Sequence, residues 1–107
     1  MVSSPALANT SATLHLLLLS PQQWPTRLPE LAQLWQPDNQ LLLIGTAVQG
    51  YDSGALLAFA KQQPIGVYQA DAIQLGLVEP LPAHLTLVST ELWATWTLHH
   101  ARCMTWR

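Results

Sequence analysis

The feature that most constrains the fold is a short apolar run that recurs along the chain. The runs are Leu14–Leu19, Leu41–Ile44, Ile65–Tyr68 and Leu85–Val88. Each is nearly free of polar residues, which is typical of strands that are buried on both faces of a sheet. A segment with helical character follows each run, and strands that alternate with helices favour parallel pairing. The sequence therefore predicts one α/β domain, a parallel sheet with helices on its faces, and leaves the strand order open.

The first helical segment presents apolar residues on one face, at the spacing of a helix: Leu28, Leu31, Leu34 and Trp35. Thr26 is its expected N-cap, and Pro29 is expected in its first turn, where a proline is tolerated. Pro37-Asp38-Asn39 is expected to end this helix.

Three more helical segments follow, and each is expected to begin at a polar residue. The second is expected from Asp52 or Ser53 to about Gln62. A short turn is expected after a cap at Asp71, with Gly76 in the left-handed position at its end. The last helix is expected to follow Ser89-Thr90 and to carry Leu92, Trp93, Trp96, His99 and His100.

The composition is unusually poor in charge. The chain has 107 residues, of which 50% are hydrophobic and only 9% are charged, whereas an ordinary soluble domain has about 25% charged residues. A domain of this length cannot bury all of its Leu, Ala and Trp side chains in one small core. We therefore expect part of the surface to be covered by a protein partner.

The basic residues argue against direct contact with nucleic acid. They are only four and lie singly along the chain: Arg27, Lys61, Arg102 and Arg107. Binding to a phosphate backbone needs several such side chains on one surface. We expect no nucleic-acid contact by this chain.

The single cysteine, Cys103, excludes a disulfide within the chain and suits a reducing compartment, so we expect a cytoplasmic protein. Residues 1–12 have no apolar period and predict a flexible N-terminal tail before a domain at 13–107. Leu14–Leu19 is too short for a membrane span, and it lacks the basic flank and cleavage site of a signal peptide.

A glycine-rich turn at Gly45–Gly50 has the spacing of a phosphate-binding loop, but Tyr51-Asp52 stands where Lys-Ser/Thr is required. A carboxylate in place of the ammonium would repel a phosphate, so a flexible turn between strand and helix is the favoured interpretation. A small-ligand site in the Gly45–Gly54 loop remains an alternative, because ligands in open α/β sheets lie beyond the carboxyl ends of strands.

The C-terminal residues contain the only other candidates for chemistry. Cys103 could be a nucleophile if Arg102 favoured its thiolate, but no helix N-terminus precedes it, which favours a passive thiol. His99, His100 and Cys103 could supply two metal ligands, whereas a structural zinc site needs four. Histidines in a last helical turn more often cap carbonyls or lie at an interface. We expect no metal and no cofactor.

No arrangement of residues predicts catalysis. The sequence has neither a nucleophile elbow of the G-x-S-x-G kind nor paired carboxylates at a useful spacing. The tryptophans are numerous for this length: Trp24, Trp35, Trp93, Trp96 and Trp106. Core packing and a protein interface explain them equally well, and the last helix with the C-terminus is the expected interface.

The order of these segments resembles the TusB/DsrH family of sulfur-relay subunits. The resemblance covers residues 13–107 and rests on short pieces in sequence: Leu14-His15, Ser20-Pro21, Pro37-Asp38, Leu41–Ile44, Ile65–Tyr68, Leu75-Gly76-Leu77 and Met104-Thr105-Trp106. It implies a DsrE-like three-layer α/β/α sandwich of four or five mainly parallel strands, in which about 103–106 form a last short strand.

The resemblance also implies a function and partners. It implies a non-catalytic subunit that joins TusC-like and TusD-like subunits in a heterohexamer, which passes persulfide sulfur toward 2-thiolation of the tRNA wobble uridine. The alternatives are that Cys103 itself accepts sulfur, or that the chain is a DsrH-like component of sulfur oxidation. The family's Gln-Asp-Gly-Val is replaced here by Gly45-Thr46-Ala47-Val48. The cysteine that the DsrH branch carries on its first helix is absent near Leu31-Ala32, which favours the TusB branch.

Overall fold

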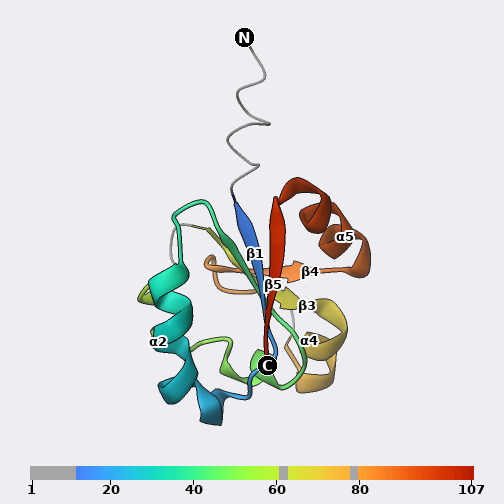
Figure 1. Ribbon diagram of the computed structural model, residues 1–107. Coiled ribbons are helices and arrows are strands. Elements are labelled where there is room, and N and C mark those ends of the chain that lie inside the picture. The colour runs from blue at the N-terminus through green and yellow to red at the C-terminus, as the bar shows by residue number, and fades with distance from the viewer. Residues whose placement is uncertain (1–11, 61–62, 78–79) are drawn as a thin grey trace.

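A single sheet of five parallel strands forms the centre of the protein. The computed structural model describes residues 12–60, 63–77 and 80–107. The strands are β1 (Thr13–Leu17), β2 (Gln40–Leu43), β3 (Ile65–Tyr68), β4 (Leu85–Val88) and β5 (Arg102–Trp106), in the order β4-β3-β2-β1-β5. All four pairings are parallel, so the predicted α/β fold is confirmed (Figure 1).

The strands lie close to the apolar runs of the sequence. β3 and β4 have the expected bounds, and β1 is buried along its whole length, as expected for a strand covered on both faces. β1 ends at Leu17 rather than Leu19, although the Leu18 N–H still donates to the Trp106 carbonyl at 2.9 Å. The final strand begins one residue earlier than the resemblance implies, at Arg102.

The helices cover the two faces of the sheet unequally. On one face lie α2 (Trp24–Leu34) and α3 (Gly54–Leu57), and α4 (Gln69–Leu75) adds Ala72 to the same buried cluster. The opposite face is covered by α5 (Thr90–His99), which lies across the sheet from α2 in Figure 1. The arrangement is the expected three layers of helix, sheet and helix.

The first helix begins before its expected cap. A 3₁₀ turn, η1 (Pro21–Gln23), leads directly into α2, so Thr26 lies inside the helix and the predicted N-cap is wrong. Pro29 is in the helix interior rather than the first turn. The reason is local: Ser20 and Gln23 form a capping box that starts the helical chain earlier than the apolar spacing indicates.

The second helical segment differs most from the prediction. Residues Gly45–Gly50 form a 3₁₀ helix, η2, instead of a flexible turn, and α3 is a single turn capped by the Ser53 side chain. The helix expected to reach Gln62 ends at Leu57, while positions 61–62 lie outside the described residues.

The last two helices follow the sequence more closely. Gly76 has a φ of 91° and takes the left-handed position after α4, as expected. Asp71, however, is inside the first turn of α4 and is not its cap. α5 begins as predicted, because the Ser89 side chain accepts a hydrogen bond from the Leu92 N–H at 3.1 Å.

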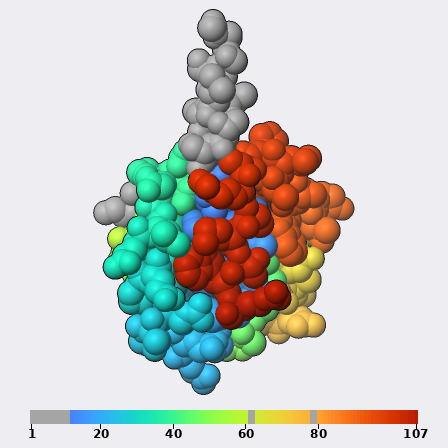
Figure 2. Space-filling view, viewed as in Figure 1, coloured from blue at the N-terminus to red at the C-terminus, as the bar shows by residue number. Residues whose placement is uncertain are grey.

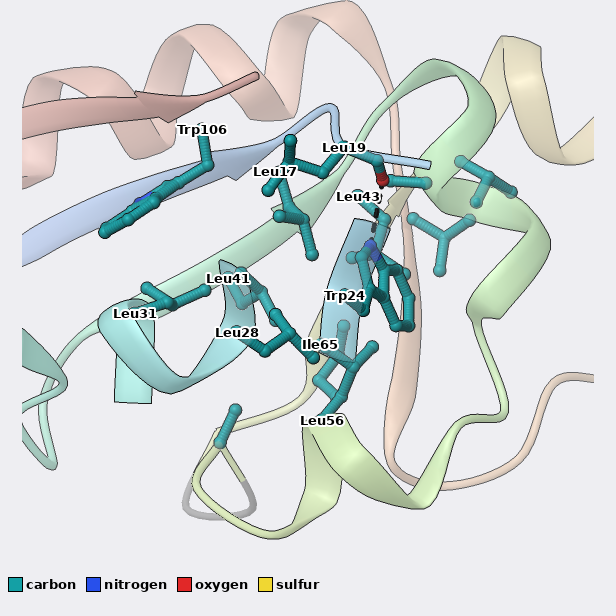
Figure 3. Packing of buried hydrophobic residues seen from close by; sticks show 14 of the residues in the cluster. Leu17, Leu19, Trp24, Leu28, Leu31, Leu41, Leu43, Leu56, Ile65 and Trp106 are labelled. Atoms are coloured by element: carbon teal, nitrogen blue, oxygen red, sulfur yellow. Dashed lines mark hydrogen bonds between the residues drawn. The ribbon is translucent and has the colours of Figure 1, made fainter. Parts of the chain in front are cut away.

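The larger hydrophobic cluster lies between the sheet and the helices α2 and α3. Figure 3 shows Leu28 and Leu31 of α2 packed against the strand residues Leu17, Leu41 and Ile65. Trp24 is fixed there as well, since its Nε1–H donates to the Leu19 carbonyl at 2.9 Å. This cluster holds most of the buried side chains of the described residues and forms the main core.

The smaller cluster lies under α5. Its buried members are Leu14, Leu16, Leu42 and Val88. α5 contributes only partly buried side chains to it, among them Trp93 and Trp96, and none of its own residues is buried.

The predicted tail, residues 1–12, lies outside the described residues except for Ala12, which is buried. Among the described residues, no helix has the length and apolar character needed to cross a membrane.

Candidate functional site

The two histidines at the end of α5 are already bonded within the helix. His99 Nδ1 lies 2.8 Å from the Thr95 carbonyl, and His100 Nδ1 lies 2.6 Å from the Trp96 carbonyl. Each Nδ1–H therefore donates to the carbonyl four residues earlier, and the Trp96 carbonyl is one of the last four, which a helix end leaves free. The prediction that these histidines cap carbonyls is confirmed, and each ring leaves only Nε2 for another partner.

Cys103 lies on β5, the edge strand, and its side chain is exposed. Partial burial raises the pKa of the Cys103 thiol above its ordinary value of 9.0. A raised pKa keeps the sulfur protonated at neutral pH, and a thiol is a much weaker nucleophile and metal ligand than a thiolate. The geometry thus gives an accessible but unactivated thiol, despite the neighbouring Arg102.

Arg102 does not face the thiol because its side chain is held elsewhere. Its Nε–H donates to the Thr13 hydroxyl at 3.2 Å, across the first rung of the β1–β5 ladder. Neighbouring residues of a strand point to opposite faces of the sheet, so Arg102 and Cys103 are on different faces. Nowhere in the described residues do three or more His, Cys, Asp or Glu side chains gather in a way that could hold a metal ion.

The Gly45–Gly54 segment lies at the carboxyl ends of β2 and β3, where ligands of open α/β sheets bind. A pocket of about 340 Å³ opens here between η2 and α4. Asp71 occupies it in part, because its carboxylate accepts a hydrogen bond from the Gly45 N–H at 2.7 Å. The amide that would begin an anion-binding turn is therefore used by a carboxylate, and the pocket is unsuited to phosphate.

A buried histidine is the feature that the sequence did not single out. His15 is only 1% exposed and lies between Trp35 and Trp106, with ring centroids 5.3 and 6.1 Å away. Trp106 Nε1–H donates to His15 Nδ1 at 3.0 Å, so the neutral ring must carry its proton on Nε2. The signal in the sequence was a lone polar residue inside an apolar run, which by itself indicates neither a ligand nor a base.

N–H groups of Trp106 and Asn39 face the two ring nitrogens of His15, but a neutral imidazole can accept only one hydrogen bond. Asn39 Nδ2 lies 3.0 Å from His15 Nε2, while Asn39 Oδ1 accepts from the Thr13 N–H at 3.1 Å. A neutral imidazole has one acceptor nitrogen, which Trp106 already uses. Burial, with a smaller contribution from the charge of His100, lowers the pKa of His15 from 6.5 to about 4. Both observations indicate a neutral, structural histidine at neutral pH.

An apolar groove of about 540 Å³ lies between α2 and the η2–α3 segment. Trp24, Leu28 and Phe59 line it together with Pro25 and Pro29, and none of the described residues that line it is ionisable. Such a lining can hold apolar groups but offers no acid, base or nucleophile.

The five tryptophans divide between core and surface. Trp24 and Trp106 are buried in the larger cluster, against which Trp35 is partly buried. Trp93 and Trp96 are partly buried under α5, and Leu98 on the same helix is 84% exposed. Core packing explains the first three and, through the smaller cluster, also engages the α5 pair, so the predicted interface on this helix stays a prediction.

The described residues thus define a class: an all-parallel α/β protein whose candidate reactive side chains are dispersed or already hydrogen-bonded. No protein-family model matches the chain, and no curated protein matches it in sequence.

Proposed function

We propose that this chain is a non-catalytic subunit of a sulfur-relay complex, one that joins TusC-like and TusD-like subunits in a heterohexamer serving 2-thiolation of the tRNA wobble uridine. The observation that carries the proposal is the ordered resemblance to the TusB/DsrH family over residues 13–107. The parallel α/β fold with a short last strand is compatible with what that resemblance implies.

The chemistry of the chain supports a non-catalytic role. The pKa of the Cys103 thiol is raised, whereas a sulfur acceptor must present a thiolate. His99 and His100 donate their Nδ1–H groups to helix carbonyls, and within the described residues neither ring is hydrogen-bonded to that thiol. In a relay that includes this chain, another subunit would supply the reactive cysteine.

Co-expression with tagged TusC-like and TusD-like subunits tests the proposal. We expect the three chains to purify together in equal amounts, and tRNA 2-thiolation to be restored in cells that lack the endogenous B-type subunit. The thiolated tRNA is measured by its retarded migration in a gel that contains organomercury. Recovery of this chain without either partner would refute the proposal.

The Cys103→Ser variant is the matched control for the non-catalytic role. It removes the thiol but retains a side chain of similar size, so complex formation and thiolation are expected to remain at the level of the unchanged chain. Loss of thiolation with an intact complex would instead identify Cys103 as part of the relay.

The exposure of Cys103 supports one competing function, in which this chain accepts sulfur itself. A persulfide at this position would add about 32 Da to the chain, which mass spectrometry detects after incubation with a loaded sulfur donor. Because the raised pKa disfavours the thiolate, we expect the TusD-like subunit to be loaded under conditions that leave Cys103 unmodified.

A further inference from the structure

β5 has a free edge whose backbone groups can be assigned from the ladder. It pairs with β1 on one side, and within residues 12–60, 63–77 and 80–107 no strand lies on the other side. The Trp106 carbonyl accepts from the Leu18 N–H, so Trp106 faces β1. Alternate residues of a strand face the same neighbour, which places Met104 toward β1 as well. The N–H and C=O groups of Cys103 and Thr105 therefore face away from the sheet.

Neither helix layer covers this edge. β5 lies at the front of Figure 1, between α2 on one side and α5 on the other, and the same strand is uncovered in the space-filling view of Figure 2. Arg102, Cys103 and Thr105 are exposed, and Met104 is partly buried. Unpaired strand groups in such a position favour pairing with another strand.

β5 lacks several of the devices that protect an edge strand from pairing. It contains no proline and no lysine, and its residues pair with β1 in an unbroken register from Arg102 to Trp106. Its one charged residue, Arg102, is exposed, and its Nε–H donates to the hydroxyl of Thr13 on the paired strand β1 rather than toward the open edge. The strand is also held in place by Trp106, whose indole is bonded to His15. A preordered strand loses little conformational entropy when it pairs.

We propose that two copies of this chain associate through β5, with the two strands antiparallel about a two-fold axis at Met104. In this register Cys103 of one copy is opposite Thr105 of the other, and each pair exchanges two hydrogen bonds between groups that already face outward. A register centred on Cys103 would need the N–H of Ala101, which donates instead to the Ala12 carbonyl at 2.9 Å. Of these two registers, the one centred on Met104 forms its hydrogen bonds only with outward-facing N–H and C=O groups of the strand itself.

The charges of β5 do not oppose the pairing of two copies in this register. Arg102 is then opposite Trp106 of the other copy, and the two Arg102 residues are about 13 Å apart along the strands, beyond the screening length at physiological salt. Leu98, four residues before β5, is 84% exposed and leaves apolar surface at the end of α5. This inference does not rest on the proposed function, since it depends only on the edge of the sheet.

Disulfide trapping of the full chain tests both the pairing and its register. Residues opposite in an antiparallel hydrogen-bonded pair have Cα atoms about 5.5 Å apart, within the range of a disulfide. Two Cys103 residues would be about 9 Å apart, beyond that range. The unchanged chain and the double variant Cys103→Ser, Thr105→Cys are each oxidised alone and then as an equal mixture.

We expect the covalent dimer to form at least tenfold faster in the mixture than in either protein alone. Sedimentation equilibrium is expected to give twice the chain mass, and Thr105→Pro, which removes an outward N–H, should weaken association at least tenfold relative to Thr105→Val. If the proline variant does not fold, the disulfide-trapping result alone decides whether two copies pair through β5. Equal trapping of one protein alone overturns the register, and a monomer, or a dimer without mixed trapping, overturns the proposal.

Discussion

The helices that cover the two faces of the sheet are buried to different degrees. On the α2 and α3 side, Leu28, Leu31 and Leu56 are buried against the strands. On the other side, α5 carries Leu92, Trp93, Trp96 and Leu98, yet none of its residues is buried. Exposed large apolar side chains nevertheless remain on both sides of the sheet, since Leu34 of α2, Ile73 and Leu75 of α4 and Leu98 of α5 are all exposed. The α2 face therefore supplies most of the stability, and α5 is the helix that is held less tightly against the sheet.

The largest expected effect is the difference in unfolding free energy between truncating a leucine on one side of the sheet and truncating one on the other. We expect Leu31→Ala to lower the free energy of unfolding by about 3 kcal/mol, because Leu31 is fully buried and its removal leaves a cavity. Leu92→Ala on α5 should cost less than half of that, since solvent already reaches this side chain. Urea unfolding of both variants measures the difference. Equal losses of unfolding free energy would contradict the difference between the two faces.

A pH effect of nearly the same size should come from His15 on the closed face. Burial and the nearby His100 lower the folded-state pKa of His15 to about 4, below the ordinary 6.5 of the unfolded chain. Its contribution to stability is therefore complete above pH 6.5 and is lost as the pH falls from 6.5 to 4, by up to about 3 kcal/mol. Urea unfolding across this range measures it, with His15→Gln as the control whose curve should be flatter. Parallel curves would contradict the assignment.

Replacing one glycine next to each tryptophan by alanine tests the same difference in packing between the two sides of the sheet. A Cβ at Gly50 would overlap the Trp24 ring, and a Cβ at Gly66 would lie 2.8 Å from the Trp96 ring and 2.9 Å from the Val88 side chain. Trp24 is buried and bonded to the Leu19 carbonyl, whereas Trp96 is only partly buried, so more of the clash at Gly66 can be relieved even though Val88 is buried. We expect Gly50→Ala to cost about 2 kcal/mol and Gly66→Ala about half as much. Thermal unfolding followed by tryptophan fluorescence checks the order.

The smallest effect concerns the two serine caps. Ser89→Ala removes the bond to the Leu92 N–H at the start of α5 and should cost about 1 kcal/mol. Ser53→Ala removes the equivalent bond at α3, a helix of a single turn, and should cost less. Helix content by circular dichroism should fall in the first variant only. A larger loss from Ser53→Ala would mean that α3 matters more than α5.

The apolar runs determined the sheet well because a strand buried on both faces leaves a simple pattern. β3 and β4 could be placed to the residue, and the cap of α5 at Ser89 and the left-handed Gly76 followed from local chemistry. The strand order could not be predicted, since it depends on which runs pair across the whole chain.

The errors lie where side chains act at a distance or where short-range bonds compete. The Gly45–Gly50 segment became a 3₁₀ helix whose first amide is bonded to Asp71, and no local pattern encodes a bond across 26 residues. α2 started early because the Ser20–Gln23 box competed with Thr26. Of the candidate site, the capping role of His99 and His100 could be predicted, whereas the burial of His15 against Trp106 could not, because the two residues meet only when β5 joins β1.

The pairing of β1 with β5 has a consequence for how the protein folds during synthesis. β1 is among the first elements to be made, but its second neighbour is separated from it by 89 residues. Until Arg102–Trp106 have been made, the Leu14–Leu17 edge stays open, and pairings between such distant segments form slowly. An unfinished or truncated chain would therefore expose an apolar strand edge, which favours aggregation and makes it a natural client for chaperones.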